Sequence, residues 1–242
     1  MGKRLDQLLV ERGLFDSRAK ARAAIEAGRV SVDGQVARKA SQEVSFAASI
    51  DAEAAHPWVG RGALKLDHAL TLWPVAVEGR AALDVGASTG GFTEVLLSRG
   101  AARVYAVDVG RGQLHPRVAA DPRVVNLEGV DARTLDATLI PEPPRLVVCD
   151  ASFIGLAKVL PVPLSLAAPD AELIALVKPQ FEAGPGHVGK GGLVRDPDLH
   201  ARVLAEVAAW LEASGWPVLT TADSPVEGGD GNREFLLRAR KA

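Results

Sequence analysis

The chain has 242 residues, of which 48% are hydrophobic and 24% charged, and its net charge of −2 argues against a strongly basic nucleic-acid binder. This length allows one medium or two smaller domains, and because no apolar run reaches about 18 residues, we find no transmembrane helix in the sequence. The single cysteine, Cys149, excludes an internal disulfide framework and a cysteine-based zinc site. The charged opening "MGKRLDQLLVERG" lacks the apolar centre of a signal peptide, so we expect a cytoplasmic protein.

The beginning of the chain predicts two helices followed by a hairpin. Leucines at helical spacing open the segment, and Gly13 can end that first helix. Ser17 is a favourable N-cap for a second helix, which Gly28 closes. The run "RVSVDGQVA" then alternates around Asp33 and Gly34, a two-residue turn that is typical of β-hairpins.

Basic residues are concentrated in the same segment. Residues 1–40 hold nine Lys and Arg against five Asp and Glu, a charge of +4, which leaves −6 on the remainder of the chain. The stretches "RLDQLL", "SRAKAR" and "GRVSVDG" resemble the RNA-binding domain of the ribosomal-protein-S-four type. This resemblance implies that four basic residues approach RNA phosphates, namely Arg4, Arg18, Lys20 and Arg22. The alternative is a basic helix face that is merely solvated.

A change in composition marks a domain boundary. The segment "FAASIDAEAAHPWVGRG" is rich in small residues and is broken by His56 and Pro57. We therefore expect an RNA-binding domain with its linker in residues 1–58 and a second domain in residues 59–242.

From Ala81 onward, strand and helix signals alternate. The predicted strands are "AALDVGAS", "RVYAVDVG", "RVVNLEG", "RLVVCDAS" and "ELIALVKP", and two more follow in "WPVLTTADSP" and "REFLLRARK". Helical patterns lie between them, the longest in "DLHARVLAEVAAWLEASG". This alternation predicts an α/β domain with a parallel sheet between two layers of helices. Ligands bind such sheets beyond the carboxyl ends of the strands.

The loop after the first of these strands reads "LDVGASTGGF". Gly86 would let the backbone approach a ligand, while Gly90 and Gly91 allow a tight entry into the following helix. The stretch G-A-S-T-G-G differs from the G-x-G-x-x-G pattern of a dinucleotide site, which faces a pyrophosphate. A ligand other than a dinucleotide is therefore favoured.

Acidic residues recur at the ends of four successive strands: Asp84, Asp108, Asp131 and Asp150. Asp108 is placed to accept both hydroxyls of a ribose, and Asp131 could reach an adenine amino group. Such acids suit a cationic nucleoside without phosphate, as in S-adenosylmethionine. Here the chain resembles the class I methyltransferases, which implies a Rossmann-like, seven-stranded, mostly parallel sheet. It also implies S-adenosylmethionine as cofactor, bound by Asp84, Gly86, Ala87, Ser88, Thr89, Gly90, Gly91, Phe92, Asp108, Asp131 and Asp150.

A lysine ends a strand that should be buried on both faces. In "ELIALVKPQFE" the apolar run 173–177 leads directly to Lys178, and Pro179 stops the strand. Lys65 lies in the predicted helix "RGALKLDHAL", on a stripe with Ala69 and Leu72. The Gly-rich segment 181–197 follows Lys178, and we expect it to close over a substrate.

Two lysines and two acids distributed in this way resemble the 2′-O-ribose methyltransferases of the FtsJ type. With the basic front segment, the resemblance narrows to the haemolysin-A-like (TlyA-type) rRNA methyltransferases; it is carried by "RGALKL", "LDVGASTGGFTE", "VVCDASFI", "LVKPQFE" and "GNREFLL". It implies a catalytic set of Lys65, Asp150, Lys178 and Glu234. It also implies a cytidine of ribosomal RNA, presented on a ribosomal subunit, as substrate. The short ends of the chain favour the large-subunit RNA, with the small-subunit RNA as the other choice.

The implied set makes chemical sense for a ribose hydroxyl, which is a poor nucleophile. A lysine can remove its proton only if the pKa of the amine falls towards neutrality, through burial or a neighbouring cation. Asp150 would hold Lys178 in line with the methyl group, and Glu234 would orient Lys65 or the ribose. The scattered histidines show no metal-ligand spacing, so we expect no metal.

Other interpretations stay open. Lys178 and Asp150 could form only a structural ion pair, although burying such a pair often gains little stability. The protein could be a ribosome-binding assembly factor that holds the cofactor without turnover. A haemolysin acting on membranes is disfavoured because the sequence has no signal, no transmembrane run and no long basic amphipathic helix. The oligomeric state is not fixed by the sequence.

Overall fold

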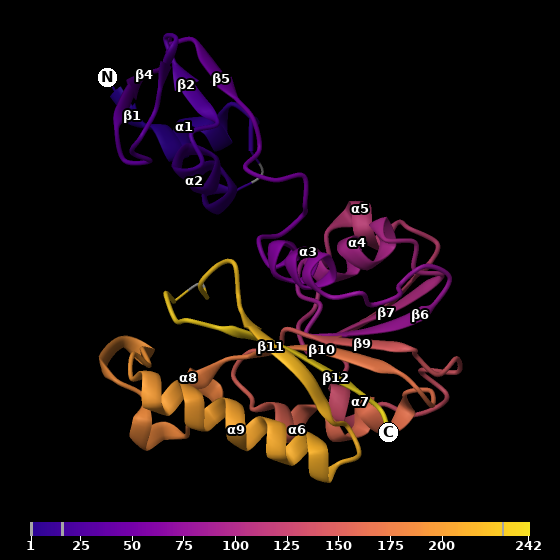
Figure 1. Cartoon of the computed structure of the whole chain (residues 1–242). Coiled ribbons are helices and arrows are strands. Elements are labelled where there is room, and N and C mark those ends of the chain that lie inside the picture. The colour runs from indigo at the N-terminus through magenta and orange to yellow at the C-terminus, as the bar shows by residue number, and fades with distance from the viewer. Residues whose placement is uncertain (1, 16, 229) are drawn as a thin grey trace. The chain divides into compact units, whose positions relative to one another are not determined.

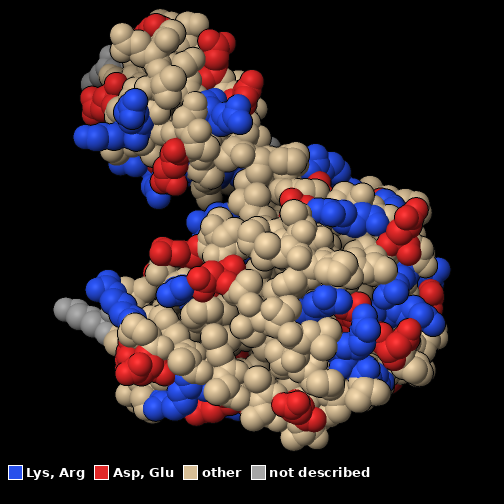
Figure 2. All heavy atoms as spheres, viewed as in Figure 1, with Lys and Arg blue, Asp and Glu red and all other residues tan. Residues whose placement is uncertain are grey.

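The computed structural model describes residues 2–15, 17–228 and 230–242, and it describes Pro185 and Lys190 by their backbone only. The chain separates into two compact units, the front unit Met1–Pro57 and the large unit Trp58–Ala242 (Figure 1). Within the described residues, no helix is long and apolar enough to cross a membrane. Figure 2 shows acidic and basic side chains interspersed over the visible face of the large unit.

The front unit packs two helices against two small sheets. Ser17 caps the second helix, since its Oγ accepts a hydrogen bond from Lys20 N at 3.3 Å. Asp33 and Gly34 form the predicted hairpin turn, with φ of 49° and 78°. Its elements are β1 (Gly2–Arg4), α1 (Leu5–Glu11), α2 (Arg18–Glu26), β2 (Val30–Val32), β3 (Gln35–Val36), β4 (Glu43–Ser45) and β5 (Ile50–Ala52).

The large unit is built on a seven-stranded sheet in the order β11-β12-β10-β9-β6-β7-β8. Only β12 runs antiparallel to its neighbours β10 and β11, so the predicted mostly parallel α/β fold is confirmed. The strands are β6 (Ala81–Val85), β7 (Arg103–Asp108), β8 (Val124–Glu128), β9 (Leu146–Cys149), β10 (Glu172–Val177), β11 (Val218–Asp223) and β12 (Phe235–Arg240). The helices are α3 (Ala63–Leu72), α4 (Gly91–Ser98), α5 (Pro116–Ala119), α6 (Leu156–Val159), α7 (Pro161–Leu166), α8 (Pro179–Glu182) and α9 (Pro197–Ala213).

Helices cover both faces of this sheet, α3, α4 and α5 on one side and α6, α7 and α9 on the other (Figure 1). Strand β10 shows why its apolar run is continuous. Leu173, Ala175 and Val177 enter one hydrophobic core, whereas Ile174 and Leu176 enter the other. Each large apolar side chain buried in this way contributes roughly 1.5–3 kcal/mol, which holds the strand firmly in the centre of the sheet.

One expected helix face is displaced. Lys65 and Ala69 of α3 are buried as predicted, but Leu72 is 49% exposed. The buried stripe of α3 is centred on Leu66 and Leu70 at i, i+4 spacing, so the last residue of the helix falls at its margin.

Candidate active site

Strand β10 carries Lys178 to the carboxyl edge of the sheet. All residues of the strand are buried between parallel β9 and antiparallel β12. Lys178 follows in extended conformation, and Pro179 begins the short helix α8, so the strand cannot continue. At the opposite end, Glu172 forms an ion pair with Arg238 of β12 at 2.7 Å. The lysine is thus placed by a strand that is fixed at both ends.

Four charged side chains of alternating sign form a row beside this strand end. Glu234 Oε2 lies 2.6 Å from Lys65 Nζ, and Lys65 Nζ lies 3.5 Å from Asp150 Oδ2. Asp150 Oδ1 in turn lies 2.7 Å from Lys178 Nζ. The row draws on α3, the residues after β9 and β10, and the residue before β12. The structure therefore brings together all four residues of the expected catalytic set.

The row is buried, and Lys178 Nζ has three partners. Lys65, Lys178 and Glu234 are 7%, 5% and 3% exposed. Besides its ion pair, Lys178 Nζ donates hydrogen bonds to the backbone oxygen of Asp150 at 3.1 Å and to Ser152 Oγ at 2.9 Å. Two cations face two anions, so the row is balanced in charge. Removing one member would leave a buried charge without its counter-ion, which costs about 3–5 kcal/mol.

Two cavities meet at this edge of the sheet. The first, which we call the lysine cavity, has a volume of about 580 Å³ and contains the whole charged row in its wall. The second, the acidic cavity, has a volume of about 560 Å³ and is lined by Asp108, Asp131 and Arg133 together with apolar side chains. Asp150, Ser152 and Phe153 belong to both walls. A ligand in one cavity can therefore present a group to the other.

The acidic cavity fits a nucleoside. Gly86 has φ of +86°, and a Cβ there would lie 3.0 Å from the Cα and N of Ala151, so only glycine lets the loop pass this close to the end of β9. Asp108 accepts hydrogen bonds from Ser88 N at 2.8 Å and Gly110 N at 2.7 Å, which fix its carboxylate and leave lone pairs for hydroxyl donors. Asp131 lies beyond β8, where it caps a short 3₁₀ turn and binds Arg133.

Most of the expected cofactor residues line one cavity or the other: Gly86, Ala87, Ser88, Thr89, Gly91, Phe92, Asp108, Asp131 and Asp150. Gly90 and Asp84 do not. A Cβ on Gly90 would lie 2.7 Å from Leu114 Cδ1, so this glycine serves packing of the loop against the segment before α5.

Asp84 is a correction to the sequence-based expectation. It lies inside β6 rather than at its tip, and its side chain is fully buried. Asp84 Oδ2 accepts a hydrogen bond from Thr93 Oγ1 of α4 at 2.7 Å, while Oδ1 has no hydrogen-bond partner among the described residues. Burial raises the pKa of this carboxyl to about 7. The residue thus ties β6 to the start of α4, beneath the loop.

Several residues of the lysine cavity escaped the sequence analysis. Phe153 is 91% exposed and has φ of +67°, and its ring contacts that of Phe181 at a tilt of 48° with centroids 5.2 Å apart. Gln180 and Asp230 also line this cavity. Phe153 and Gln180 each lie within three residues of an expected site residue, which is the only sequence signal for them. Within the described residues, no group of three or more His, Cys, Asp or Glu is arranged to hold a metal ion.

The basic residues of the front unit are organised by an acid that the sequence analysis missed. Asp6 is fully buried and accepts hydrogen bonds from Arg4 at 3.1 Å, Arg18 at 2.9 Å and Arg22 at 3.1 Å. The bonds from Arg4, then those from Arg18 and Arg22, hold the pKa of this carboxyl well below its usual range. The three arginine side chains are each 39–49% exposed. Lys20 lies on α2 as well.

The sheet order, the glycine loop after β6 and the buried charged row at the strand ends define a class I methyltransferase domain. Residues 58–241 match the model of the FtsJ-like methyltransferase family, and residues 3–50 match that of the S4 domain. The chain belongs to the TlyA-type family of FtsJ-like methyltransferases.

Two relatives illustrate this membership, and a third protein shares only the fold. The 16S/23S rRNA (cytidine-2′-O)-methyltransferase TlyA of Mycobacterium tuberculosis H37Rv is 49% identical over 98% of this chain and 89% of that protein. A solved structure from Streptococcus thermophilus, described as a hemolysin, is 37% identical with a TM-score of 0.79, and covers 100% of this chain and 89% of its own. Magnesium protoporphyrin IX methyltransferase from Synechocystis PCC 6803, with bound SAH, shares the fold at 18% identity and a TM-score of 0.53, over 75% of this chain and 84% of that one.

Proposed function

We propose that the protein transfers a methyl group from S-adenosylmethionine to the ribose 2′-hydroxyl of a cytidine in ribosomal RNA. The observation that carries this proposal is the buried row of Lys65, Asp150, Lys178 and Glu234 in the lysine cavity, next to a cavity that fits a nucleoside. The name of the 49% identical relative supports the same substrate and reaction.

The acidic cavity would hold the nucleoside part of the cofactor. Asp108 would accept the ribose hydroxyls, Asp131 the adenine amino group, and Gly86 would admit the ligand to the backbone. When bound, S-adenosylmethionine supplies an electrophilic methyl group on a sulfonium. Asp150, which belongs to both cavity walls, lies where that group and the substrate would meet.

In the lysine cavity, Lys178 would act as the base. Once the Lys178 ammonium had given up a proton, its amine would take the proton of the 2′-hydroxyl, which would make the ribose oxygen the nucleophile for the methyl group that the bound cofactor supplies. Asp150 and Ser152 fix the position of Lys178 Nζ, and this positioning supports an in-line displacement. Glu234 holds Lys65, whose ammonium would supply a positive charge beside the reacting oxygen.

Residues 1–58 would bind the RNA, and residues 59–242 would carry out the methyl transfer. The S4 match supports this division for the front part. Arg4, Arg18 and Arg22 share one buried carboxylate, so their combined charge remains positive and their exposed guanidinium groups are pre-positioned for phosphates, with Lys20 on the same helix.

Replacing Asp6 with alanine is expected to weaken RNA binding even though it removes a negative charge. Without Asp6 the three guanidinium groups lose their common acceptor and spread into solvent, so fewer of them meet phosphates together. RNA affinity and its salt dependence, together with the melting temperature, measure the effect. Glu53→Ala is the matched control, because Glu53 is an exposed carboxylate that forms an ion pair with Arg29. Tighter RNA binding by Asp6→Ala would contradict this role.

The expected substrate is rRNA within ribosomal subunits, which would place the activity in the cytoplasm. Large-subunit and small-subunit RNA are both tested, since the name of the 49% identical relative covers both. The experiment is transfer of labelled methyl from S-adenosylmethionine to purified unmodified subunits, followed by alkaline hydrolysis. A label in alkali-resistant dinucleotides at a cytidine is the expected result. Tight binding without transfer to either subunit would favour the assembly factor instead.

A further inference from the structure

One residue in the wall of the lysine cavity has a buried hydrogen-bond acceptor that no described residue uses. Gln180 lies two residues after Lys178, on α8, and lines this cavity. Its Nε2 donates to Asp230 Oδ2 at 3.3 Å, whereas its Oε1 is buried and has no hydrogen-bond partner among the described residues. A buried acceptor without a donor is costly, so a group that binds in the cavity is expected to supply one.

The orientation of the Gln180 amide is fixed by chemistry. Asp230 is an ionised acceptor: burial raises the pKa of its carboxyl, but the hydrogen bonds from Asn232 and Gln180 outweigh burial and lower it overall. If the amide were flipped, Gln180 Oε1 would face this carboxylate and be repelled. Gln180 Nε2 therefore faces Asp230, and the carbonyl oxygen is the atom that remains for a ligand.

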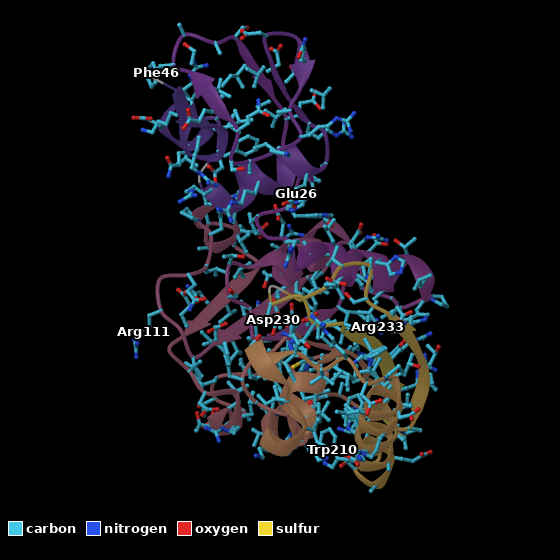
Figure 3. The ribbon with its side chains drawn as sticks, turned by 90° about the vertical axis from the view of Figure 1, so that its left-hand side faces the viewer. Glu26, Phe46, Arg111, Trp210, Asp230 and Arg233 are labelled. Atoms are coloured by element: carbon cyan, nitrogen blue, oxygen red, sulfur yellow. The ribbon has the colours of Figure 1, made fainter. Side chains whose placement is uncertain are left out.

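Asp230 cannot turn away to release the amide. Its Oδ1 accepts from Asn232 N at 3.1 Å, and its Oδ2 accepts from Asn232 Nδ2 at 2.8 Å. Asn232 is itself 1% exposed, and it binds Val194 N at 2.8 Å and the backbone oxygen of Gly192 at 2.9 Å. The labelled Asp230 in Figure 3 lies on the β11–β12 segment that carries this arrangement. Asn232 thus joins that segment to the Gly-rich segment after α8.

The two pyrimidine bases of RNA differ in the hydrogen-bonding group at ring position 4. Cytosine carries a 4-amino donor where uracil carries an O4 acceptor, and otherwise the two rings have nearly the same shape. An acceptor that cannot flip pairs with the amino group and repels the uracil oxygen. Because Gln180 and Lys178 line one cavity, a nucleoside whose 2′-hydroxyl meets Lys178 has its base in the same space.

We propose that Gln180 Oε1 accepts a hydrogen bond from the 4-amino group of the target cytosine, and that Asp230 makes this contact selective for cytidine over uridine by fixing the amide. The proposal rests on the proposed ribose methylation and names the residues that choose the base. Gln180 is the specificity residue, and Asp230 is a positioning residue that acts through it.

The test compares subunits that carry C or U at the target position. The wild-type enzyme should favour C in kcat/KM by roughly 5- to 100-fold. The amide introduced by Asp230→Asn offers both a donor and an acceptor, so this variant frees Gln180 to flip. It should bring the C:U ratio of kcat/KM at least about fivefold closer to one, mainly by raising the activity on U.

Gln180→Leu removes the contact and should lower activity on C towards that on U. Asp223→Asn, which changes an exposed carboxylate of β11 paired with Arg233, should keep the wild-type ratio.

The outcomes are separable. If the wild-type enzyme methylates neither target, the proposed function fails. If it methylates C and U equally, or if Asp230→Asn keeps the wild-type ratio, only the present proposal fails. Because Asp230→Asn is nearly isosteric, it is the decisive variant if Gln180→Leu does not fold. Loss of activity on both targets in Asp230→Asn would also count against the proposal, since a freed amide should change the ratio.

Discussion

Replacing Lys178 with alanine is expected to lower methyl transfer to ribosomal RNA by at least about 100-fold, which is the usual contribution of a positioned base. Binding of S-adenosylmethionine should change little, because Lys178 lines the lysine cavity and not the acidic cavity. Single-turnover transfer and a cofactor titration on the same preparation measure the two quantities. Lys158→Ala, at an exposed lysine of α6, is the control that should keep full activity.

Lys178→Arg separates a base from a structural ion pair. Arginine keeps the positive charge and can still pair with Asp150, but its guanidinium is not deprotonated at working pH. If Lys178 serves only the ion pair, the arginine variant should restore much of the activity that alanine loses. We expect it to remain nearly as inactive as the alanine variant. An arginine variant with more than half of the wild-type rate would overturn the assignment of Lys178 as the base.

Asp84 is expected to make the stability of the large unit depend on pH. Burial raises the pKa of its carboxyl from 3.8 to about 7, so between these values the folded chain holds a proton that the unfolded chain has lost. Stability from this group is therefore fully present below about pH 3.8 and is lost as the pH rises towards 7. A shift of this size corresponds to roughly 4 kcal/mol in the free energy of unfolding.

Asp84→Asn removes the titrating group and keeps its shape, including an acceptor for Thr93 Oγ1. Relative to the wild type, the variant should gain stability on going from pH 5 to pH 8. Denaturant unfolding of both proteins at pH 5 and pH 8 gives the difference in their unfolding free energies at each pH. The contributions of the other titrating groups are common to both proteins and cancel in this difference. Asp67→Asn is the control, since Asp67 is a partly exposed carboxylate paired with Arg99. An equal stability difference between wild type and Asp84→Asn at pH 5 and pH 8 would contradict the assignment.

Sequence patterns located part of this site well. A buried apolar run that ends in Lys178 and a neighbouring run that ends at Asp150 are bound to meet, because parallel strands end at the same edge of a sheet. Glu234 joins them only because β12 runs antiparallel between β10 and β11, and the resemblance to a known family, not periodicity, supplied that placement.

Other residues could not be read from the sequence. An acid near a strand end looks the same whether it faces a ligand or, like Asp84, a helix behind the strand. Asp6 gains its role from arginines that reach it across α1 and α2, and Gln180 stands out only when every hydrogen-bonding atom is accounted for. Such features depend on side-chain direction, which sequence spacing does not encode.

The charged row can be complete only after β12 has joined the sheet, because Glu234 directly precedes this strand. The pair between Lys65 and Glu234 joins residues 169 positions apart, and β12 can insert only beside a finished β10. A chain that has formed β6 to β10 but not yet received β12 lacks Glu234 at Lys65 and leaves Glu172 without its arginines. Because closing so long a loop costs conformational entropy, we expect this contact to form late in folding. We therefore expect a partly folded chain that lacks β12 to have no assembled catalytic row.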